Sequence, residues 1–179
     1  MNGDLYLADA LKRFREARAQ CDRALAQVPV ARWTHRLDPE SNSLATLMLH
    51  LSGNMLSRWT DFLATDGEKP DRDRDAEFED PDTFDPEALR ARWERGWACL
   101  FRTLESLSAA DLDRTVTIRN QPHTVLEAVN RQLAHYPYHT GQIVFLAKHL
   151  RRDSWQSLSV PRGGTGAYNA AMMKGQSQA

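Results

Sequence analysis

The chain has 179 residues, of which 41% are apolar and 26% are charged, and its formal net charge is −1. This size and balance are typical of one globular domain, and a nearly neutral chain has no general attraction to nucleic acid or to an anionic membrane. No apolar run approaches the ~18 residues of a membrane span, and the first residues do not resemble a secretory signal. The two cysteines form no Cys-x-x-Cys pair. We therefore expect a cytoplasmic protein with reduced thiols and without a nucleic-acid or membrane partner.

Apolar residues that recur at intervals of three and four predict two helices in the first third of the chain. The first is expected over residues 4–27, with Asp4 as its N-cap. The second is expected over residues 43–64, capped by Ser43 or a neighbouring serine. This second helix has an aliphatic stripe and, beside it, a polar stripe with His50 in its middle. A helix with two such faces is expected deep in a bundle, next to a polar seam.

The segment that follows the second helix is strongly acidic. Residues 66–87 include eleven acidic and three basic residues, a net charge of −8. We expect residues 65–85 to form an exposed crossover without regular structure. A third helix is predicted to begin at Pro86 with Asp85 as its cap. Gly96, between two tryptophans in this helix, predicts a close approach to another helix.

Residues 114–119 alternate at a period of two and predict a short strand or hairpin before the fourth helix. A capping box at Thr124 and Glu127 opens that helix, which is expected to run to about Leu150. Pro137 lies inside it and is expected to kink the axis, because proline removes one backbone hydrogen bond. The kink fits either a site that needs an adjusted geometry or a tolerated bend in a packed helix.

Together these elements predict an all-α fold: a four-helix bundle with a long crossover loop, over residues 1–152. The crossover is long enough for the second and third helices to run parallel, which makes the second antiparallel to the fourth. Residues 153–179 form a tail that is too poor in apolar residues for a core of its own. Trp155 and Leu158 are expected to dock on the bundle, and the last ten or so residues are expected to be disordered.

Three histidines are placed to meet inside such a bundle. His135 and His139 lie on one face of the fourth helix, since they are four residues apart. At 1.5 Å per residue, His50 lies about 21 Å from the end of the second helix, and the pair lies about 17 and 23 Å from the start of the fourth. Three neutral imidazoles suit Zn²⁺, Ni²⁺, Co²⁺ or Fe²⁺ and leave a fourth position open, as in catalytic zinc sites. Asn54 and Gln142 lie about one turn from the imidazoles.

An isolated His-x-x-x-His pair is equally typical of imidazoles with structural hydrogen bonds, so the metal interpretation depends on His50. Tyr136 occupies the position at which zincins have glutamate, and no Glu-x-x-His occurs, which excludes zincins and di-iron carboxylate bundles. His35, His123 and His149 are more typical of structural or surface histidines.

The pattern His50-Leu-Ser-Gly-Asn54, followed by His135-x-x-x-His139-x-Gly-Gln142, resembles the DinB/YfiT-like metalloenzyme superfamily. The resemblance covers nearly the whole chain, and the tail at residues 155–169 is similar to that of an uncharacterised DinB-like branch. It implies an up-down-down-up four-helix bundle, a divalent metal, often zinc or nickel, on the three histidines, and a homodimer. Characterised relatives include thiol S-transferases that use bacillithiol, mycothiol or related thiols, and a mycothiol-dependent isomerase.

Three functional hypotheses follow. In the first, which we favour, the metal activates water or a low-molecular-weight thiol for attack on a small electrophilic substrate, as in a thiol S-transferase or a hydrolase. Asn54, Tyr138 and Gln142 would then orient the histidines or the substrate. In the second, the chain is a non-catalytic stress-response dimer in which the metal fastens the bundle. In the third, it is a metal-free interaction module whose recognition surface is the acidic crossover.

Overall fold

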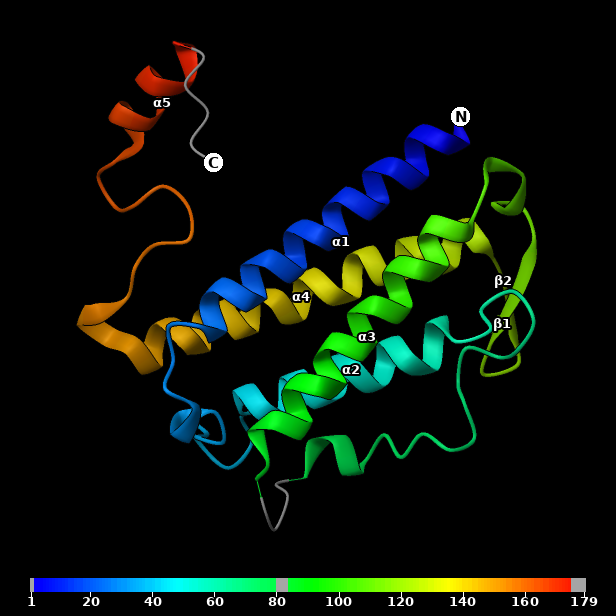
Figure 1. Cartoon of the computed structure of the whole chain (residues 1–179), viewed down its shortest axis with the longest axis horizontal. Coiled ribbons are helices and arrows are strands. Elements are labelled where there is room, and N and C mark those ends of the chain that lie inside the picture. The colour runs from blue at the N-terminus through cyan, green and yellow to red at the C-terminus, as the bar shows by residue number, and fades with distance from the viewer. Residues whose placement is uncertain (1, 80–83, 175–179) are drawn as a thin grey trace.

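The computed structural model describes residues 2–79 and 84–174 and is mostly helical, with one small antiparallel sheet (Figure 1). The helices are α1 (Gly3–Leu25), α2 (Leu44–Trp59), α3 (Pro86–Ser106), α4 (Val125–Arg151) and the short α5 (Thr165–Met173). Between α3 and α4, the strands β1 (Thr115–Ile118) and β2 (Gln121–Thr124) pair as a hairpin. The predicted helices and the predicted hairpin are all present, and the caps at Ser43, Asp85 and Thr124 are confirmed. The cap predicted at Asp4 is wrong, because α1 begins earlier and is capped by the side chain of Asn2.

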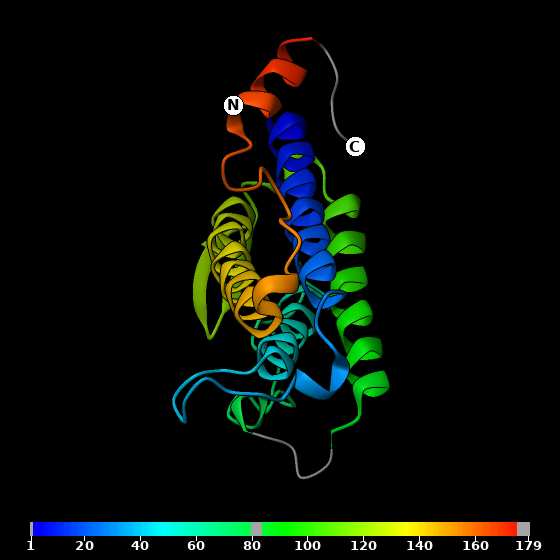
Figure 2. The ribbon, with the colours of Figure 1, turned by 90° about the vertical axis from the view of Figure 1, so that its left-hand side faces the viewer.

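The long helices pack mainly as two pairs, α2 against α3 and α1 against α4 (Figures 1 and 2). In Figure 1, α1 and α4 run from right to left, whereas α2 and α3 run from left to right. Residues 60–79, which follow α2, return along the lower edge of that view. As a result, α2 is antiparallel to α4, the arrangement that the three-histidine prediction requires.

Each long helix contributes one large aromatic side chain to the centre of the core: Phe14, Trp59, Trp97 and Tyr136, all fully buried. The ring of Tyr136 lies 5.6 Å from that of Phe14 and 6.0 Å from that of Trp97, measured between centroids. Its hydroxyl accepts a hydrogen bond from Nε1 of Trp59 and donates one to Oδ1 of Asn54, both 3.0 Å long. Tyr136 therefore fixes α4 against α2.

Helix α2 ends at Trp59, five residues earlier than predicted. The chain turns at Asp61, whose φ of 47° is incompatible with a continuing helix. The returning crossover then packs on the last turn, where the hydroxyl of Ser57 donates a hydrogen bond of 3.0 Å to the carbonyl of Gly67. His50 consequently lies nine residues from the helix end, a rise of about 14 Å rather than 21 Å.

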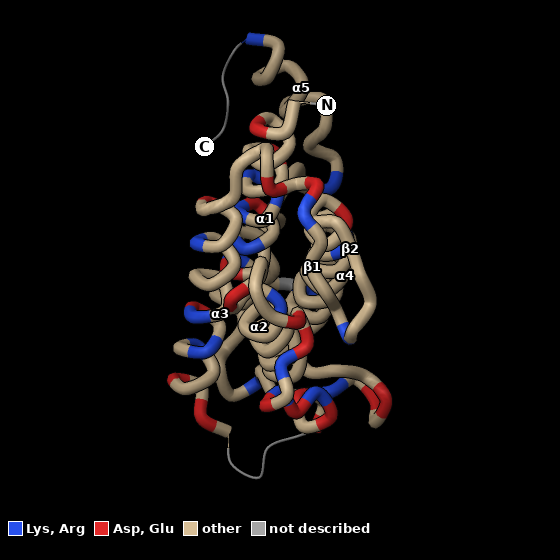
Figure 3. Tube along the Cα trace, turned by 90° about the vertical axis from the view of Figure 1, so that its right-hand side faces the viewer, with Lys and Arg blue, Asp and Glu red and all other residues tan. Residues whose placement is uncertain are grey.

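The acidic crossover is not simply an exposed segment, contrary to the sequence-based expectation. The side chains of Arg72 and Glu77 are each only 4% exposed and are joined by two hydrogen bonds of 2.8 Å. The 3₁₀ turn Ala76–Phe78 packs against α2. Figure 3 shows acidic and basic residues side by side along this segment. Pairing of opposite charges accounts for the burial of Arg72 and Glu77, whereas several other acidic residues of the segment are exposed.

The hairpin turn is formed by Arg119 and Asn120, with φ values of 55° and 58°, as a two-residue type I′ turn requires. Both backbone N–H groups donate hydrogen bonds of 2.8 Å to the carboxylate of Asp66. Burial by itself raises the pKa of Asp66, but these bonds and one from the N–H of Glu68 outweigh it and lower the pKa to about 2. Asp66 therefore ties the crossover to the hairpin.

The tail only partly docks on the long helices. Trp155 and Leu158 are partly buried and pack against the core, as predicted. Helix α5 has no buried residue and lies apart from the long helices (Figures 1 and 2). Of the residues predicted to be disordered, 170–174 belong to α5 or directly follow it, and 175–179 lie outside the described residues. Among the described helices, none combines the length and the apolar character needed to cross a bilayer.

Gly96 allows the predicted close approach of α3 to α2, because a Cβ atom at this position would lie 3.1 Å from the Cα of Ser52. We expect Gly96→Val to lower the free energy of unfolding by about 1–3 kcal/mol through overpacking, as measured by urea denaturation. The matched control is Gly141→Val in α4, where nothing lies within 4 Å. An equal loss in both variants would contradict the proposed contact.

Asp66→Asn tests the link between the crossover and the hairpin. Folding lowers the pKa of Asp66 from 3.8 to about 2, so its contribution to stability is present above pH ~4 and is lost as the pH falls towards 2. We expect the wild type to be more stable than the variant at pH 7, and the difference to shrink between pH 4 and pH 2 in urea titrations. Asp71→Asn, an exposed position in the same crossover, serves as the control. A difference that does not change with pH would contradict the assignment.

Candidate metal centre

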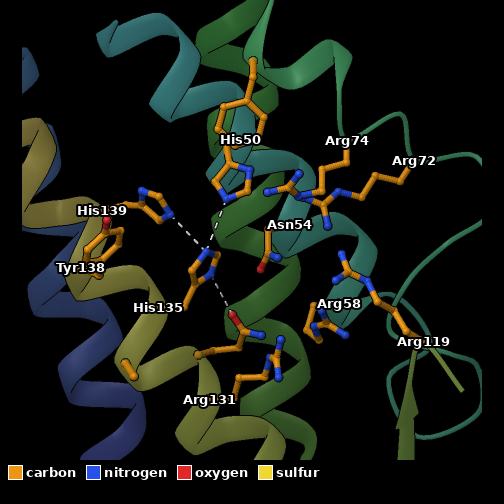
Figure 4. Close-up of a pocket in the computed structure, with 13 residues that line it drawn as sticks. His50, Asn54, Arg58, Arg72, Arg74, Arg119, Arg131, His135, Tyr138 and His139 are labelled. Carbon is orange, nitrogen blue, oxygen red and sulfur yellow. Dashed lines mark hydrogen bonds between the residues drawn. The ribbon is translucent and has the colours of Figure 1, made fainter. Parts of the chain in front are cut away.

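Three histidines from two helices converge between α2 and α4 (Figure 4). Nε2 of His135 lies 3.4 Å from Nε2 of His50 and 3.1 Å from Nε2 of His139. One ligand nitrogen from each ring lies within 4.8 Å of the other two. The three histidines predicted from the sequence are therefore close enough together to hold a metal ion.

Two of the three nitrogen separations are close to what a bound ion requires. Three imidazole nitrogens at about 2.0–2.1 Å from a tetrahedral ion are held about 3.3 Å apart, and the separations at His135 of 3.1 and 3.4 Å bracket this value. The common level arises because His50 lies nine residues before the end of α2 and His135 lies ten residues after the start of the antiparallel α4. The donor set thus suits a divalent cation, and the third pair, His50 and His139, lies within 4.8 Å.

Each imidazole is oriented by a hydrogen bond from its other nitrogen, in which Nδ1–H donates to a side-chain oxygen. The pairs are His50 with Glu77 (3.0 Å), His135 with Gln132 (3.2 Å) and His139 with Gln142 (3.2 Å). A neutral ring protonated at Nδ1 carries its lone pair on Nε2, which is the nitrogen that faces the centre of the cluster. This arrangement of outer partners is typical of metal-bound histidines.

Glu77, which orients His50, is itself held in place by its neighbours. Arg72 binds both carboxylate oxygens, and Gly53 leaves the space for them, since a Cβ there would lie 1.9 Å from Oε1 of Glu77. Burial by itself raises the pKa of Glu77, but the hydrogen bonds from Arg72 and His50 outweigh it and lower the pKa below its ordinary value. Glu77 is therefore a carboxylate, and it supplies a negative charge directly behind the imidazole.

The two histidines of α4 are neutral at physiological pH. Burial lowers the pKa of His135 to about 3, with further contributions from the neighbouring His139 and His50. Burial also lowers the pKa of His139, and this outweighs the hydrogen bond with Gln142, which raises it. Neutral imidazole is the form that binds a metal ion.

Helix α4 carries both histidines through Pro137 without ending. Tyr136, between His135 and Pro137 in sequence, points into the core and anchors this part of the helix through its hydroxyl. The kink expected at Pro137 stays a prediction.

The histidine cluster forms part of the wall of a cavity of about 520 Å³, a size typical of small-molecule sites. Asn54 and Tyr138 line the same cavity. Asn54 also accepts the hydrogen bond from Tyr136, and Tyr138 is 66% exposed, with its ring centroid 5.0 Å from that of His139. Gln142 contacts His139 rather than the cavity. All three residues predicted to support the site therefore lie next to it, in different roles.

The remaining histidines lie outside the cluster. His35 and His149 are exposed, and His123 is partly buried in β2. Their assignment as structural or surface histidines agrees with these positions.

Two of the orienting residues, Glu77 and Gln132, were not predicted from the sequence. Gln132 precedes His135 by three residues, just as Gln142 follows His139 by three, and this spacing was a usable signal. Glu77 offered none, because it is one of eleven acidic residues in its segment and only the fold brings it to His50.

Glu77→Gln tests the orienting role of this carboxylate. We expect zinc affinity to fall about 10- to 100-fold, as is usual when an outer partner of a metal ligand is changed. The measurement is a competition titration with a chromophoric chelator, together with a melting curve to confirm folding. Glu79→Gln, an exposed position two residues further along the crossover, is expected to match the wild type. Equal affinities in all three proteins would contradict the role assigned to Glu77.

Comparison with known proteins places the chain in one family. A family profile described as "Protein of unknown function (DUF1572)" matches residues 2–164, a range that includes the four long helices, the hairpin and the three clustered histidines. No curated protein matches the chain. Because the match covers most of its length, the chain belongs to the DUF1572 family.

Proposed function

We propose that this chain is a divalent-metal-dependent enzyme whose ion, zinc or nickel, is held by His50, His135 and His139. The observation that carries the proposal is the convergence of three imidazole nitrogens on the wall of a small-molecule-sized cavity. A bound ion of this kind lowers the pKa of a ligand water towards about 7, or keeps a thiol in its thiolate form. The resulting nucleophile would attack a small electrophilic substrate, and the reaction would be thiol S-transfer or hydrolysis.

Two features favour catalysis over a purely structural ion. Among the described residues, the ligating side chains that meet here number three, whereas structural zinc sites are usually closed by four protein ligands. The cluster also faces a cavity instead of being enclosed in the apolar core. Both features leave room for a water molecule or a substrate beside the histidines.

The chain's own residues prepare the site for such a reaction. Glu77, Gln132 and Gln142 hold the rings in one orientation, and Phe78 packs beside His50 with ring centroids 4.7 Å apart. The apolar ring of Phe78 limits the water around the reacting atoms. In thiol transfer the proton passes to solvent, sulfur bonds to the electrophilic carbon, and the leaving group departs with the bonding electron pair.

We further propose that the fold is the up-down-down-up four-helix bundle of the DinB/YfiT-like superfamily. The shared direction of α2 and α3, the crossover between them and the order of the histidines along the chain support this. The same resemblance leads us to propose a homodimer. Tyr138 and Phe145 are 66% and 67% exposed on α4 and are candidates for its contact surface. Light scattering coupled to gel filtration measures the oligomeric state.

The central test is the metal content and reactivity of protein purified without a nickel column. We expect about one zinc or nickel ion per chain by elemental analysis, and thiol-dependent conversion of an electrophilic dye such as chlorodinitrobenzene. His135→Ala removes one ligand, and we expect it to lose the ion and to lower the rate at least about 100-fold.

His149→Ala is the matched control, since this histidine is exposed on the same helix and lies outside the cluster. It should keep both the ion and the activity. Substoichiometric metal in the wild type would refute the metal site. If the wild type contains stoichiometric metal but reacts no faster than His135→Ala, the ion would only fasten the helices, as in a non-catalytic stress-response dimer.

A further inference from the structure

Five arginines line the cavity beside the histidine cluster: Arg58, Arg72, Arg74, Arg119 and Arg131. They come from α2, from the crossover, from the hairpin turn and from α4, so the sequence showed no basic groove. Among the described residues, no acidic side chain lines this cavity. These arginines differ in whether a carboxylate outside the cavity neutralises them.

Three of the five have acidic partners. Arg72 pairs with Glu77 and Glu68, Arg119 pairs with Glu68 at 3.1 Å, and Arg74 lies 3.9 Å from Asp75. Their charges are at least partly compensated within the protein. They help to hold the crossover and the hairpin around the cavity, and they do not by themselves indicate a ligand.

Arg58 is different, because it is buried and forms no hydrogen bond or ion pair with the described residues. It lies on α2, eight residues after His50, and its side chain faces the cavity (Figure 4). The residue is only 3% exposed, yet its Nε and Nη1 atoms have no hydrogen-bond acceptor in the described part of the chain. Burial lowers the pKa of Arg58, but a guanidinium stays protonated in proteins. A buried charge without a partner is costly, so this position calls for an anion.

Arg131 is the second arginine without a carboxylate partner. It lies on α4 four residues before His135, and its guanidinium forms no hydrogen bond or ion pair with the described residues. Figure 4 shows Arg58 and Arg131 on the side of the pocket opposite His50. Burial is the main cause that lowers the pKa of Arg58; the charge of Arg131 also lowers it, whereas that of Glu68 raises it. The two cations therefore repel each other, and an anion between them would relieve that repulsion.

We propose that Arg58 and Arg131 form an anion-binding subsite, which holds a carboxylate or phosphate group of the substrate while its reactive end reaches the histidines. The inference rests on the proposed function for the identity of the reactive end, but the anion site itself does not require the metal. Guanidinium groups suit both oxyanions because their N–H donors match two oxygens at once. The rise of about 12 Å along α2 between His50 and Arg58 separates the two ends. The substrate is thus a small molecule with a carboxylate or phosphate group at one end and an electrophilic centre or a thiol several bonds away.

The experiment measures anion binding without relying on turnover. Inorganic phosphate and succinate are titrated calorimetrically into the full chain at low ionic strength, before and after treatment with a chelator. The chelated sample excludes direct binding of the anion to a metal ion. We expect both samples of the wild type to bind at least one of the two probes, and the comparison of phosphate with succinate identifies the preferred anion.

Arg58→Gln is expected to weaken that binding about tenfold or more, as is usual when a charged hydrogen-bond donor is removed. Arg131→Gln should have an effect in the same direction, and it keeps the test decisive if Arg58→Gln fails to fold, because Arg131 is exposed. Arg102→Gln, an exposed position on α3 outside the cavity, is the matched control and should bind like the wild type.

The outcomes separate this inference from the proposed metal function. If neither probe binds, or if the Arg58 and Arg131 variants bind as tightly as the Arg102 variant, the anion subsite is refuted. Cobalt titrations of the same proteins, read by visible absorption, report on the histidines alone. If cobalt does not bind but an anion still binds in an arginine-dependent way, the metal centre is refuted and the anion subsite is supported. The result we expect is cobalt binding that is unchanged by Arg58→Gln, together with weakened binding of the preferred anion.

Discussion

The hydroxyl of Tyr136 is the contact on which the arrangement of the site depends. It accepts a hydrogen bond from Trp59 and donates one to Asn54, so that a single side chain of α4 is fixed at two points of α2. Both partners are buried, and a buried polar group that loses its partner costs more than an exposed one. The register between the two helices is therefore strongly determined. His135, the residue directly before Tyr136, is carried to the level of His50 by the same constraint.

The crossover between α2 and α3 completes the site from the other side. Glu77 lies behind His50, and Arg72 holds Glu77 with two hydrogen bonds in a position where both side chains are almost fully buried. Such a buried ion pair adds little net stability, because desolvation offsets most of the attraction. Its effect is geometric: it fixes one imidazole and brings a segment that looks polar and irregular into contact with α2. Gly53 is the residue on α2 that makes this contact sterically possible.

The electrostatics of the cavity favour anionic ligands. Two of the histidines are kept neutral by burial, and the carboxylate of Glu77 lies behind the cluster and does not line the cavity. Arg58 and Arg131 add positive charge at the other end, and neither forms a hydrogen bond or an ion pair with a described carboxylate. Under the proposed function, a divalent cation would make the interior more positive still. A thiolate nucleophile and an acidic substrate would both be attracted to it.

The sequence by itself determined the features that depend on short-range interactions. Helix periodicity, the caps at Ser43, Asp85 and Thr124, and the alternation before the hairpin act over a few residues, and the structure has each of them. The pair His135 and His139 is equally local, and His50 could be added by counting residues along antiparallel helices.

Only the tertiary structure decided the rest. The early end of α2, the burial of Glu77 and the gathering of arginines from residues 58 to 131 depend on contacts between segments far apart in the chain. No local pattern distinguishes Glu77 from the other acids of its segment, or Arg58 from a surface arginine. Their roles are set by which neighbours exclude water from them, and that exclusion exists only once the helices have packed.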